Sequence, residues 1–178
     1  METAPALMIV GGSTSSAVTA RANAAPPIGV IAEEMGYFPI TQANPKTGEP
    51  VTVMVPQRVR RHSSSQAIRL AEYMNKKQKT TIYTAYWCPH CARQRELFGR
   101  EAWALLDVVE CAPRGYRAQP SLCLKEGIDG YPTWKIGTTV VSGERELADL
   151  AQLVGFKGWD PAQEENVPPP LGSSQCRN

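Results

Sequence analysis

Two cysteines that could carry out chemistry, Cys88 and Cys91, stand three positions apart in the stretch TAYWCPHC. A pair at this spacing can help to bind a metal ion, close a small structural ring, or exchange disulfides with other thiols. The pair follows a run of β-forming residues and precedes a helical pattern, which is the setting of a redox-active dithiol. The local context therefore favours thiol–disulfide exchange over the other two uses.

The expected position at a helix start assigns a separate role to each residue of this motif. Cys88 lies where free N–H groups and the helix dipole favour an anion, which lowers the thiol pKa and makes Cys88 the nucleophile. Cys91, one turn later, is the resolving thiol, and Pro89 suits the first helical position because it has no N–H to lose. His90 can add a positive charge or a hydrogen bond to the thiolate. A stabilised thiolate favours the reduced state, so the pair is expected to oxidise partner thiols.

A zinc site is the main alternative, and the sequence argues against it. Structural zinc requires four ligands, and a second close cysteine pair would be the strong signal. The next two cysteines, Cys111 and Cys123, are 12 positions apart, and His62 and His90 are the only histidines. We therefore expect no metal and no other cofactor.

The elements around the dithiol alternate between strands and helices. A buried strand over 80–86 precedes the motif, and a helix over 92–106 follows it, with a candidate kink at Gly99. The order strand, helix, strand, dithiol, helix, strand, helix, hairpin, helix combines parallel and antiparallel strands. It predicts an α/β protein of the thioredoxin-like fold, with a central mixed sheet flanked by helices.

Composition divides the 178 residues into four segments. Nineteen basic and 17 acidic residues give a net charge of +2, which gives no reason to expect nucleic acid as a partner. No apolar run approaches the roughly 18 residues of a transmembrane segment. The expected segments are a leader or disordered segment 1–36, an extension with a candidate β-hairpin 37–62, a thioredoxin-like domain 63–156 whose first strand could be 50–55, and a disordered tail 157–178.

Three longer motifs resemble one known family. AYWCPHCARQRELFGREAW, VECAPRGYRAQPSLC and GIDGYPTWKIG together resemble the thioredoxin-like domain that is fused to vitamin K epoxide reductase in cyanobacteria and plant plastids. The resemblance covers roughly residues 63–156. The sequence lacks a counterpart of the membrane reductase domain, so either the reductase is a separate polypeptide or this chain has another task.

The resemblance implies how the site is built. Cys88 and Cys91 would be the redox-active pair, and Pro132 would be cis, facing the disulfide. The backbone of Tyr131 would then be presented to an extended substrate strand. The residues expected to contact substrate are Trp87, Pro89, Tyr131 and Thr133, and those expected to act in catalysis are Cys88, His90, Cys91 and Pro132.

The same resemblance implies partners and a compartment. Electrons would pass from thiol-containing substrate proteins to the membrane vitamin K epoxide reductase-like protein and its quinone. The location would be a plastid, with the thylakoid lumen as the narrower expectation. In standard thioredoxins a buried carboxylate precedes the first cysteine by six residues, and here that position is Ile82. This departure argues against efficient disulfide reduction.

The other three cysteines lie outside the dithiol motif. Cys111 and Cys123 match the second cysteine pair of the family, and we favour a structural disulfide, with a relay or two separate thiols left open. Cys176, near the C-terminus, is expected to be an unpaired exposed thiol. A second class of function also stays open: a non-catalytic binding or assembly factor in which residues 37–61 make the main contact and the dithiol is passive.

Overall fold

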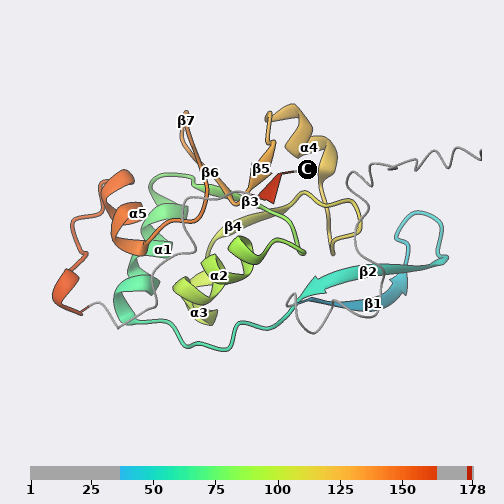
Figure 1. Ribbon diagram of the computed structural model, residues 1–178, viewed down its shortest axis with the longest axis horizontal. Coiled ribbons are helices and arrows are strands. Elements are labelled where there is room, and N and C mark those ends of the chain that lie inside the picture. The colour runs from blue at the N-terminus through green and yellow to red at the C-terminus, as the bar shows by residue number, and fades with distance from the viewer. Residues whose placement is uncertain (1–36, 164–175, 178) are drawn as a thin grey trace, which may run out of the picture.

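The computed structural model describes residues 37–163 and the backbone of residues 176 and 177. The expected leader lies outside the described residues. The central sheet has four strands in the order β4-β3-β6-β7 (Figure 1). Strand β3 runs parallel to β4 and antiparallel to β6, and β7 is antiparallel to β6. The strand bounds are β3 (Thr81–Thr84), β4 (Asp107–Glu110), β6 (Thr133–Ile136) and β7 (Thr139–Ser142).

Within residues 37–163, five α-helices flank this mixed sheet, so the expected thioredoxin-like fold is present. Helix α1 begins after Ser64, whose hydroxyl accepts a hydrogen bond of 3.2 Å from the Ala67 N–H and so satisfies one free donor of the first turn. The helices are α1 (Ser65–Lys76), α2 (Pro89–Phe98), α3 (Arg100–Trp103), α4 (Pro120–Lys125) and α5 (Leu147–Leu153).

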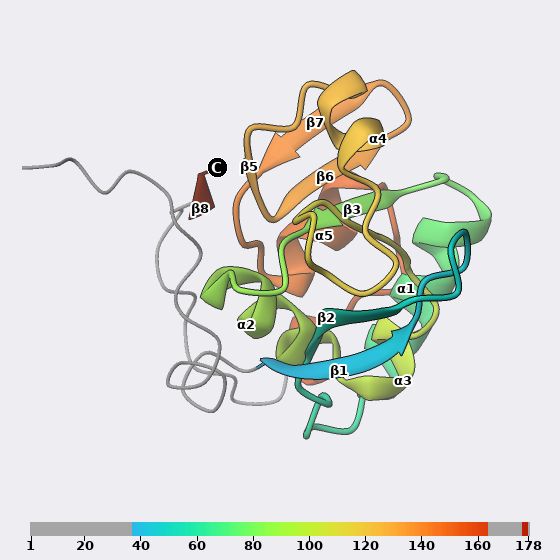
Figure 2. The same ribbon diagram turned by 90° about the vertical axis from the view of Figure 1, so that its right-hand side faces the viewer.

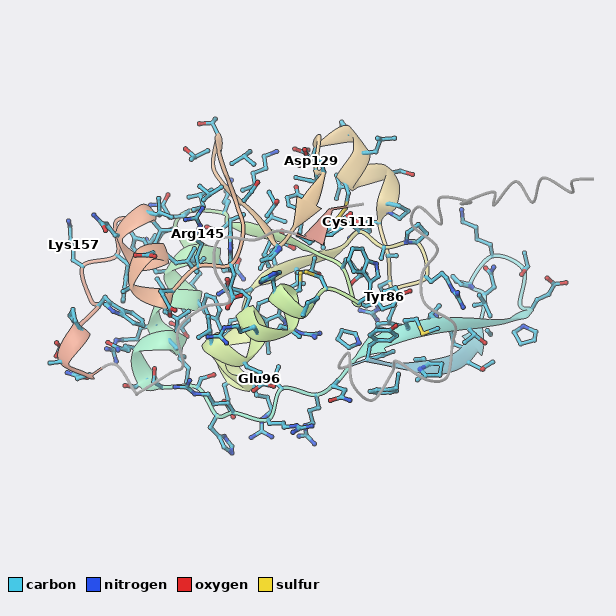
Figure 3. All side chains as sticks on the ribbon, in the orientation of Figure 1. Tyr86, Glu96, Cys111, Asp129, Arg145 and Lys157 are labelled. Atoms are coloured by element: carbon cyan, nitrogen blue, oxygen red, sulfur yellow. A yellow bond between two sulfur atoms is a disulfide. The ribbon has the colours of Figure 1, made fainter. Side chains whose placement is uncertain are left out.

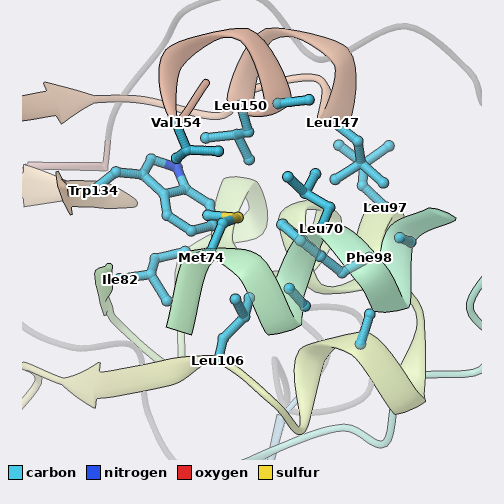
Figure 4. Close-up of a cluster of buried hydrophobic side chains, with 14 of the residues drawn as sticks. Leu70, Met74, Ile82, Leu97, Phe98, Leu106, Trp134, Leu147, Leu150 and Val154 are labelled. Atoms are coloured by element: carbon cyan, nitrogen blue, oxygen red, sulfur yellow. The ribbon is translucent and has the colours of Figure 1, made fainter. Parts of the chain in front are cut away.

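The hydrophobic core consists of two clusters, and the side chains of β3 alternate between them. Ile82 and Tyr83 are consecutive, so their side chains point to opposite faces of the sheet. Ile82 and Trp134 are fully buried among side chains of α1, α2, α3 and α5, as Figure 4 shows. Tyr83 belongs to the second cluster, which also contains both cysteines of the dithiol. Each face of β3 therefore packs into one of the two hydrophobic clusters.

The predicted helix over 92–106 is two helices rather than one kinked helix. Helix α2 ends at Phe98 and α3 begins at Arg100, with Gly99 between them at φ = 78°. A Cβ at Gly99 would lie 2.6 Å from the backbone nitrogen of Ser63. The positive φ and the close backbone both require glycine, and they turn the chain at this point.

The extension forms a hairpin with its own two-stranded sheet, β1 (Tyr37–Ala43) and β2 (Pro50–Pro56). Strand β2 contains the segment 50–55 but does not join the central sheet. Its contact with the rest of the protein is a bridge at Met54, whose N–H donates to the carbonyl of Arg114 at 2.7 Å. Figure 2 shows the hairpin packed along one side of the domain.

Of the segment from residue 157 onward, which the sequence predicts to be a disordered tail, the structure describes residues 157–163 and the backbone of 176 and 177. A 3₁₀ turn, η1, covers Pro161–Gln163. The two-residue strand β8 (Cys176–Arg177) pairs antiparallel with β5 (Gly130–Tyr131), and the two strands lie side by side in both ribbon views (Figures 1 and 2). None of the helices within the described residues has the length and apolar character needed to cross a membrane.

Candidate functional site

The dithiol lies where β3 gives way to α2. Strand β3 ends at Thr84, a short loop follows, and Cys88 is the N-cap residue of α2 with Pro89 in the first turn. Cys88 has an extended backbone (φ = −80°, ψ = 118°), and the helix has no side-chain cap there. Cys88 thus stands at the helix end where free N–H groups and the helix dipole favour an anion.

The two cysteines of the motif are in different chemical states. Cys88 is disulfide-bonded, whereas Cys91 is a free thiol, so the two are not bonded to each other. Both are buried. Burial raises the pKa of the Cys91 thiol to about 12, against the opposing effects of a backbone hydrogen bond at Ala85 and the charge of Arg95. Cys91 therefore carries its proton at neutral pH and needs a base before it can attack.

A short segment after β5 faces the nucleophile. The Tyr131–Pro132 peptide bond is cis, and the carbonyl oxygen of Tyr131 lies 3.5 Å from the Cys88 sulfur. The Trp87 ring meets the Tyr131 ring edge-on, with 6.0 Å between the centroids. The Thr133 hydroxyl donates to the Gly130 carbonyl at 2.8 Å, which holds the segment in place. The structure thus brings Trp87, Cys88, Tyr131, Pro132 and Thr133 together.

His90 makes a contact that the sequence did not predict. Its Nδ1 lies 3.1 Å from Oε2 of Glu144, and the Arg93 Nε lies 2.6 Å from the other oxygen of the same carboxylate. The Glu144 side chain is fully buried. The sequence had suggested Cys88 as the partner of His90, but the contact that the structure gives the ring is with Glu144. A buried carboxylate thus balances the positive charge on this face of α2.

Glu110 is a half-buried carboxylate at the site that sequence reasoning missed. Its Oε1 accepts hydrogen bonds from the N–H groups of Ala112 (2.9 Å) and Tyr86 (3.2 Å). Burial nevertheless raises the pKa of Glu110 to about 7. Gly115 packs so closely that a Cβ there would lie 2.3 Å from the Glu110 Cγ. The one available signal was the acid inside the apolar strand motif Val-Val-Glu-Cys.

Glu110 and Cys91 line one cavity of about 380 Å³. Arg95 lines it too, and burial lowers the pKa of this arginine. The exposed residues Tyr116 and Arg117 belong to the same lining, so the cavity links the buried thiol to the surface. Tyr86, labelled in Figure 3, lies between this site and the hairpin, where it packs edge-on against Tyr37 with 4.9 Å between centroids. A thiol, a base of suitable pKa and a guanidinium therefore share one space.

The second cysteine pair is bonded. Cys111, labelled in Figure 3, forms a disulfide with Cys123, with an S–S distance of 2.01 Å. The bond joins the end of β4 to α4 and closes the loop that carries Gly115. Closing a loop of this size contributes on the order of 3 kcal/mol on the chain-entropy model. The same bond also holds the wall of the cavity beside Glu110.

Metal ligands do not gather around this site. Within residues 37–163, no group of three His, Cys, Asp or Glu side chains is placed to hold a metal ion. The pairing of Cys111 with Cys123 also removes both thiols from any shared site with the dithiol.

Comparison with known proteins identifies a relative among plant oxidoreductases. No protein-family model matches the chain. The chain is 46% identical over 107 residues to the thiol-disulfide oxidoreductase LTO1 of Arabidopsis thaliana, and the match covers 58% of this chain. It covers 28% of that relative, so the chain spans less than a third of the length of the protein it matches. Together with the fold, this identity supports a thioredoxin-like domain of the same kind.

Proposed function

We propose that this protein is a thiol–disulfide oxidoreductase that uses Cys88 and Cys91 to oxidise thiols in partner proteins. The observation that carries the proposal is the placement of Cys88 at the start of α2, 3.5 Å from the Tyr131 carbonyl, with Cys91 buried behind it. The Arabidopsis relative is a thiol-disulfide oxidoreductase, which supports the same activity.

The reaction begins from a Cys88–Cys91 disulfide. A substrate thiolate attacks the Cys88 sulfur, the bond to Cys91 breaks, and Cys91 leaves as a thiolate that takes up a proton. A second substrate thiolate then attacks the substrate sulfur of the mixed disulfide, and Cys88 leaves as a thiolate. The substrate has lost two electrons and gained a disulfide, and the enzyme pair has gained the two electrons.

Glu110 supplies the proton that Cys91 needs on leaving and removes it when Cys91 attacks. A thiol of pKa about 12 is a poor leaving group and a weak nucleophile unless its proton is transferred in the same step. A carboxyl of pKa about 7 is partly protonated and partly ionised at neutral pH, so it serves both directions. Glu110 thereby acts in place of the buried carboxylate that standard thioredoxins have at the position of Ile82.

Net oxidation is the proposed direction because the surroundings stabilise the reduced pair. The start of α2 favours a Cys88 thiolate. The reduced pair then passes its electrons to a membrane vitamin K epoxide reductase-like protein and its quinone, and the location is a plastid, in the thylakoid lumen. The support for this acceptor and this compartment is the resemblance of the three sequence motifs. The oxidoreductase itself uses no cofactor beyond its cysteines.

Trapping with Cys91→Ser, combined with Cys176→Ser so that no other free thiol of the chain can release the partner, tests the proposed function. This variant cannot resolve the mixed disulfide, so partner proteins are expected to accumulate on Cys88 and to be released by a reductant. Adding Cys88→Ser to this variant gives the matched control, which captures nothing. Equal capture by both variants would contradict the proposal.

A second candidate function is a binding or assembly factor with a passive dithiol. The observation that favours it is the β1–β2 hairpin, which lies outside the central sheet and carries Phe38 at 44% exposure. The double variant Cys88→Ser with Cys91→Ser separates the two functions in cells. Loss of function in that variant supports the enzyme, and retained function supports the binding factor.

A further inference from the structure

The bonding states of the cysteines raise the question of which sulfur is bonded to Cys88. Cys88 is disulfide-bonded, yet Cys91 is free and Cys111 is bonded to Cys123. The chain has five cysteines, and the fifth is Cys176. The nucleophile of the proposed reaction is thus bonded to a sulfur other than that of its expected partner.

Backbone pairing brings the C-terminal strand to the nucleophile. Strand β8 pairs antiparallel with β5, and Cys176 stands opposite Tyr131 in this register. Residues opposite one another in an antiparallel pair have Cα atoms about 4.5–5.5 Å apart. The Tyr131 carbonyl oxygen lies 3.5 Å from the Cys88 sulfur, so the pairing sets the backbone of Cys176 beside the reactive thiol.

Burial of Cys88 agrees with this arrangement. The residue is 0% exposed, although it begins a helix at the edge of the domain, where a nucleophile must be reached by its substrates. Strand β8 lies along β5 and so occupies the edge that the cis-proline segment would otherwise present to a substrate.

We propose that Cys176 is a third redox-active cysteine, which forms a disulfide with Cys88 and binds at the substrate edge as an internal substitute for a protein substrate. The proposal rests on the proposed function of Cys88.

The exchange is balanced without an added oxidant. The Cys176 thiolate attacks the Cys88 sulfur of the Cys88–Cys91 disulfide, the Cys88–Cys176 bond forms, and Cys91 leaves as a thiolate that takes up a proton. One disulfide and one thiol are present before and after. In the reverse step Glu110 accepts the proton of Cys91, Cys91 attacks Cys88, and Cys176 leaves. The internal bond thus stores the oxidised state until a substrate thiolate displaces the tail.

The test is closure of the internal bond in full-length Cys91→Ser protein. Reaction with glutathione disulfide places glutathione on Cys88, and Cys176 is expected to displace it. A tethered thiol has an effective concentration in the millimolar range, so this release should be roughly 100-fold faster than release by about 10 μM of a free cysteine peptide added to Cys91→Ser with Cys176→Ser. Peptide mapping should find Cys88 linked to Cys176 within one chain. Persistent glutathione on Cys88, or chains cross-linked through Cys176, would overturn the proposal.

A shifted thiol tests the role of strand pairing. Adding Ser174→Cys and Cys176→Ser to the Cys91→Ser protein moves the thiol two positions away from the register opposite Tyr131 while keeping it in the same chain. Loss of the register opposite Tyr131 should slow closure by about 10-fold. Equal rates in the two proteins would overturn the assignment to the substrate edge.

The two proposals can fail separately. In Cys176→Ser protein, with Cys91 intact, a glutathione buffer tests the Cys88–Cys91 disulfide alone. If that disulfide forms reversibly while Cys176 never links to Cys88 in the other variants, the third-cysteine proposal fails and the oxidoreductase proposal stands. If Cys88 and Cys91 form no disulfide in any buffer, the proposed function fails.

Discussion

The carboxylate of Glu110 and the thiol of Cys91 line the same cavity, although they come from β4 and α2. Register brings them together: β3 and β4 are parallel, and Glu110 is paired with Thr84, the last residue of the strand that leads into the dithiol. Burial raises the pKa of both groups, to about 7 for Glu110 and about 12 for Cys91. This relationship is the basis of the proposed proton transfer.

Glu110→Gln should slow the attack of Cys91 on a Cys88–glutathione mixed disulfide by about 100-fold at pH 7, the usual contribution of a general base. In the parent protein the rate should rise with pH through about 7, as Glu110 ionises. In the variant it should rise in proportion to hydroxide, because the Cys91 pKa lies far above this range. Stopped-flow measurement in a Cys176→Ser background excludes competition from the tail. Identical pH profiles would rule out Glu110 as the base.

The same substitution should change how stability depends on pH. The folded-state pKa of Glu110 is raised from 4.5 to about 7, so the folded protein prefers the protonated carboxyl. Its contribution to stability is fully present below about pH 4.5 and is lost as pH rises through 7, by no more than about 3 kcal/mol. Glu110→Gln removes this loss, and its amide oxygen can still accept the N–H groups of Tyr86 and Ala112. Urea unfolding at pH 5 and pH 8 measures the difference, and the same pH dependence in both proteins would contradict it.

Glu144→Gln should make the dithiol more oxidising. The Glu144 carboxylate neutralises Arg93 in the helix that begins at Cys88, so its removal leaves a positive charge that stabilises the Cys88 thiolate and with it the reduced state. A shift on the order of 30 mV is expected in a glutathione titration. Loss of the buried partner of Arg93 should also cost about 3 kcal/mol of stability. Glu72→Gln, which removes a partly exposed carboxylate 3.8 Å from Lys76, is the control and should leave the potential unchanged. A shift toward reducing potentials in Glu144→Gln would contradict this account.

Replacing Cys111 and Cys123 together by serine should lower the free energy of unfolding by about 3 kcal/mol, because the loop they close becomes free in the unfolded chain. Exchange between Cys88, Cys91 and a model dithiol peptide should persist under conditions where the variant is folded. Calorimetry and a peptide-oxidation assay measure the two effects. Normal stability combined with lost turnover would instead indicate that the pair is a relay.

Much of the fold could be predicted because its signals are local. The strand before the dithiol, the helix start at the motif and the late hairpin depend on neighbouring residues, and the structure places them in the expected order. The hairpin of the extension was also expected. Its separation from the central sheet was not, because the partner of a β-strand is chosen by contacts distant in sequence, here between Met54 and the loop at Arg114.

The electrostatics of the site could not be predicted in the same way. Glu110 reaches the dithiol through the register of β4 against β3, and Glu144 reaches His90 across 54 positions of sequence. A sequence pattern identifies an acid but does not show that folding will bury it beside a thiol. Cys176 lies in a short polar segment, and the pairing of two residues with β5 produces no periodicity that could be recognised.

The most direct test of the central claim is a glutathione redox titration of the Cys88–Cys91 pair, followed by mass mapping of the disulfide in Cys176→Ser protein. The account predicts one reversible two-electron transition with a potential well above the roughly −270 mV of thioredoxin. A pair that forms no reversible disulfide, or one that titrates at about −270 mV or below, would contradict it.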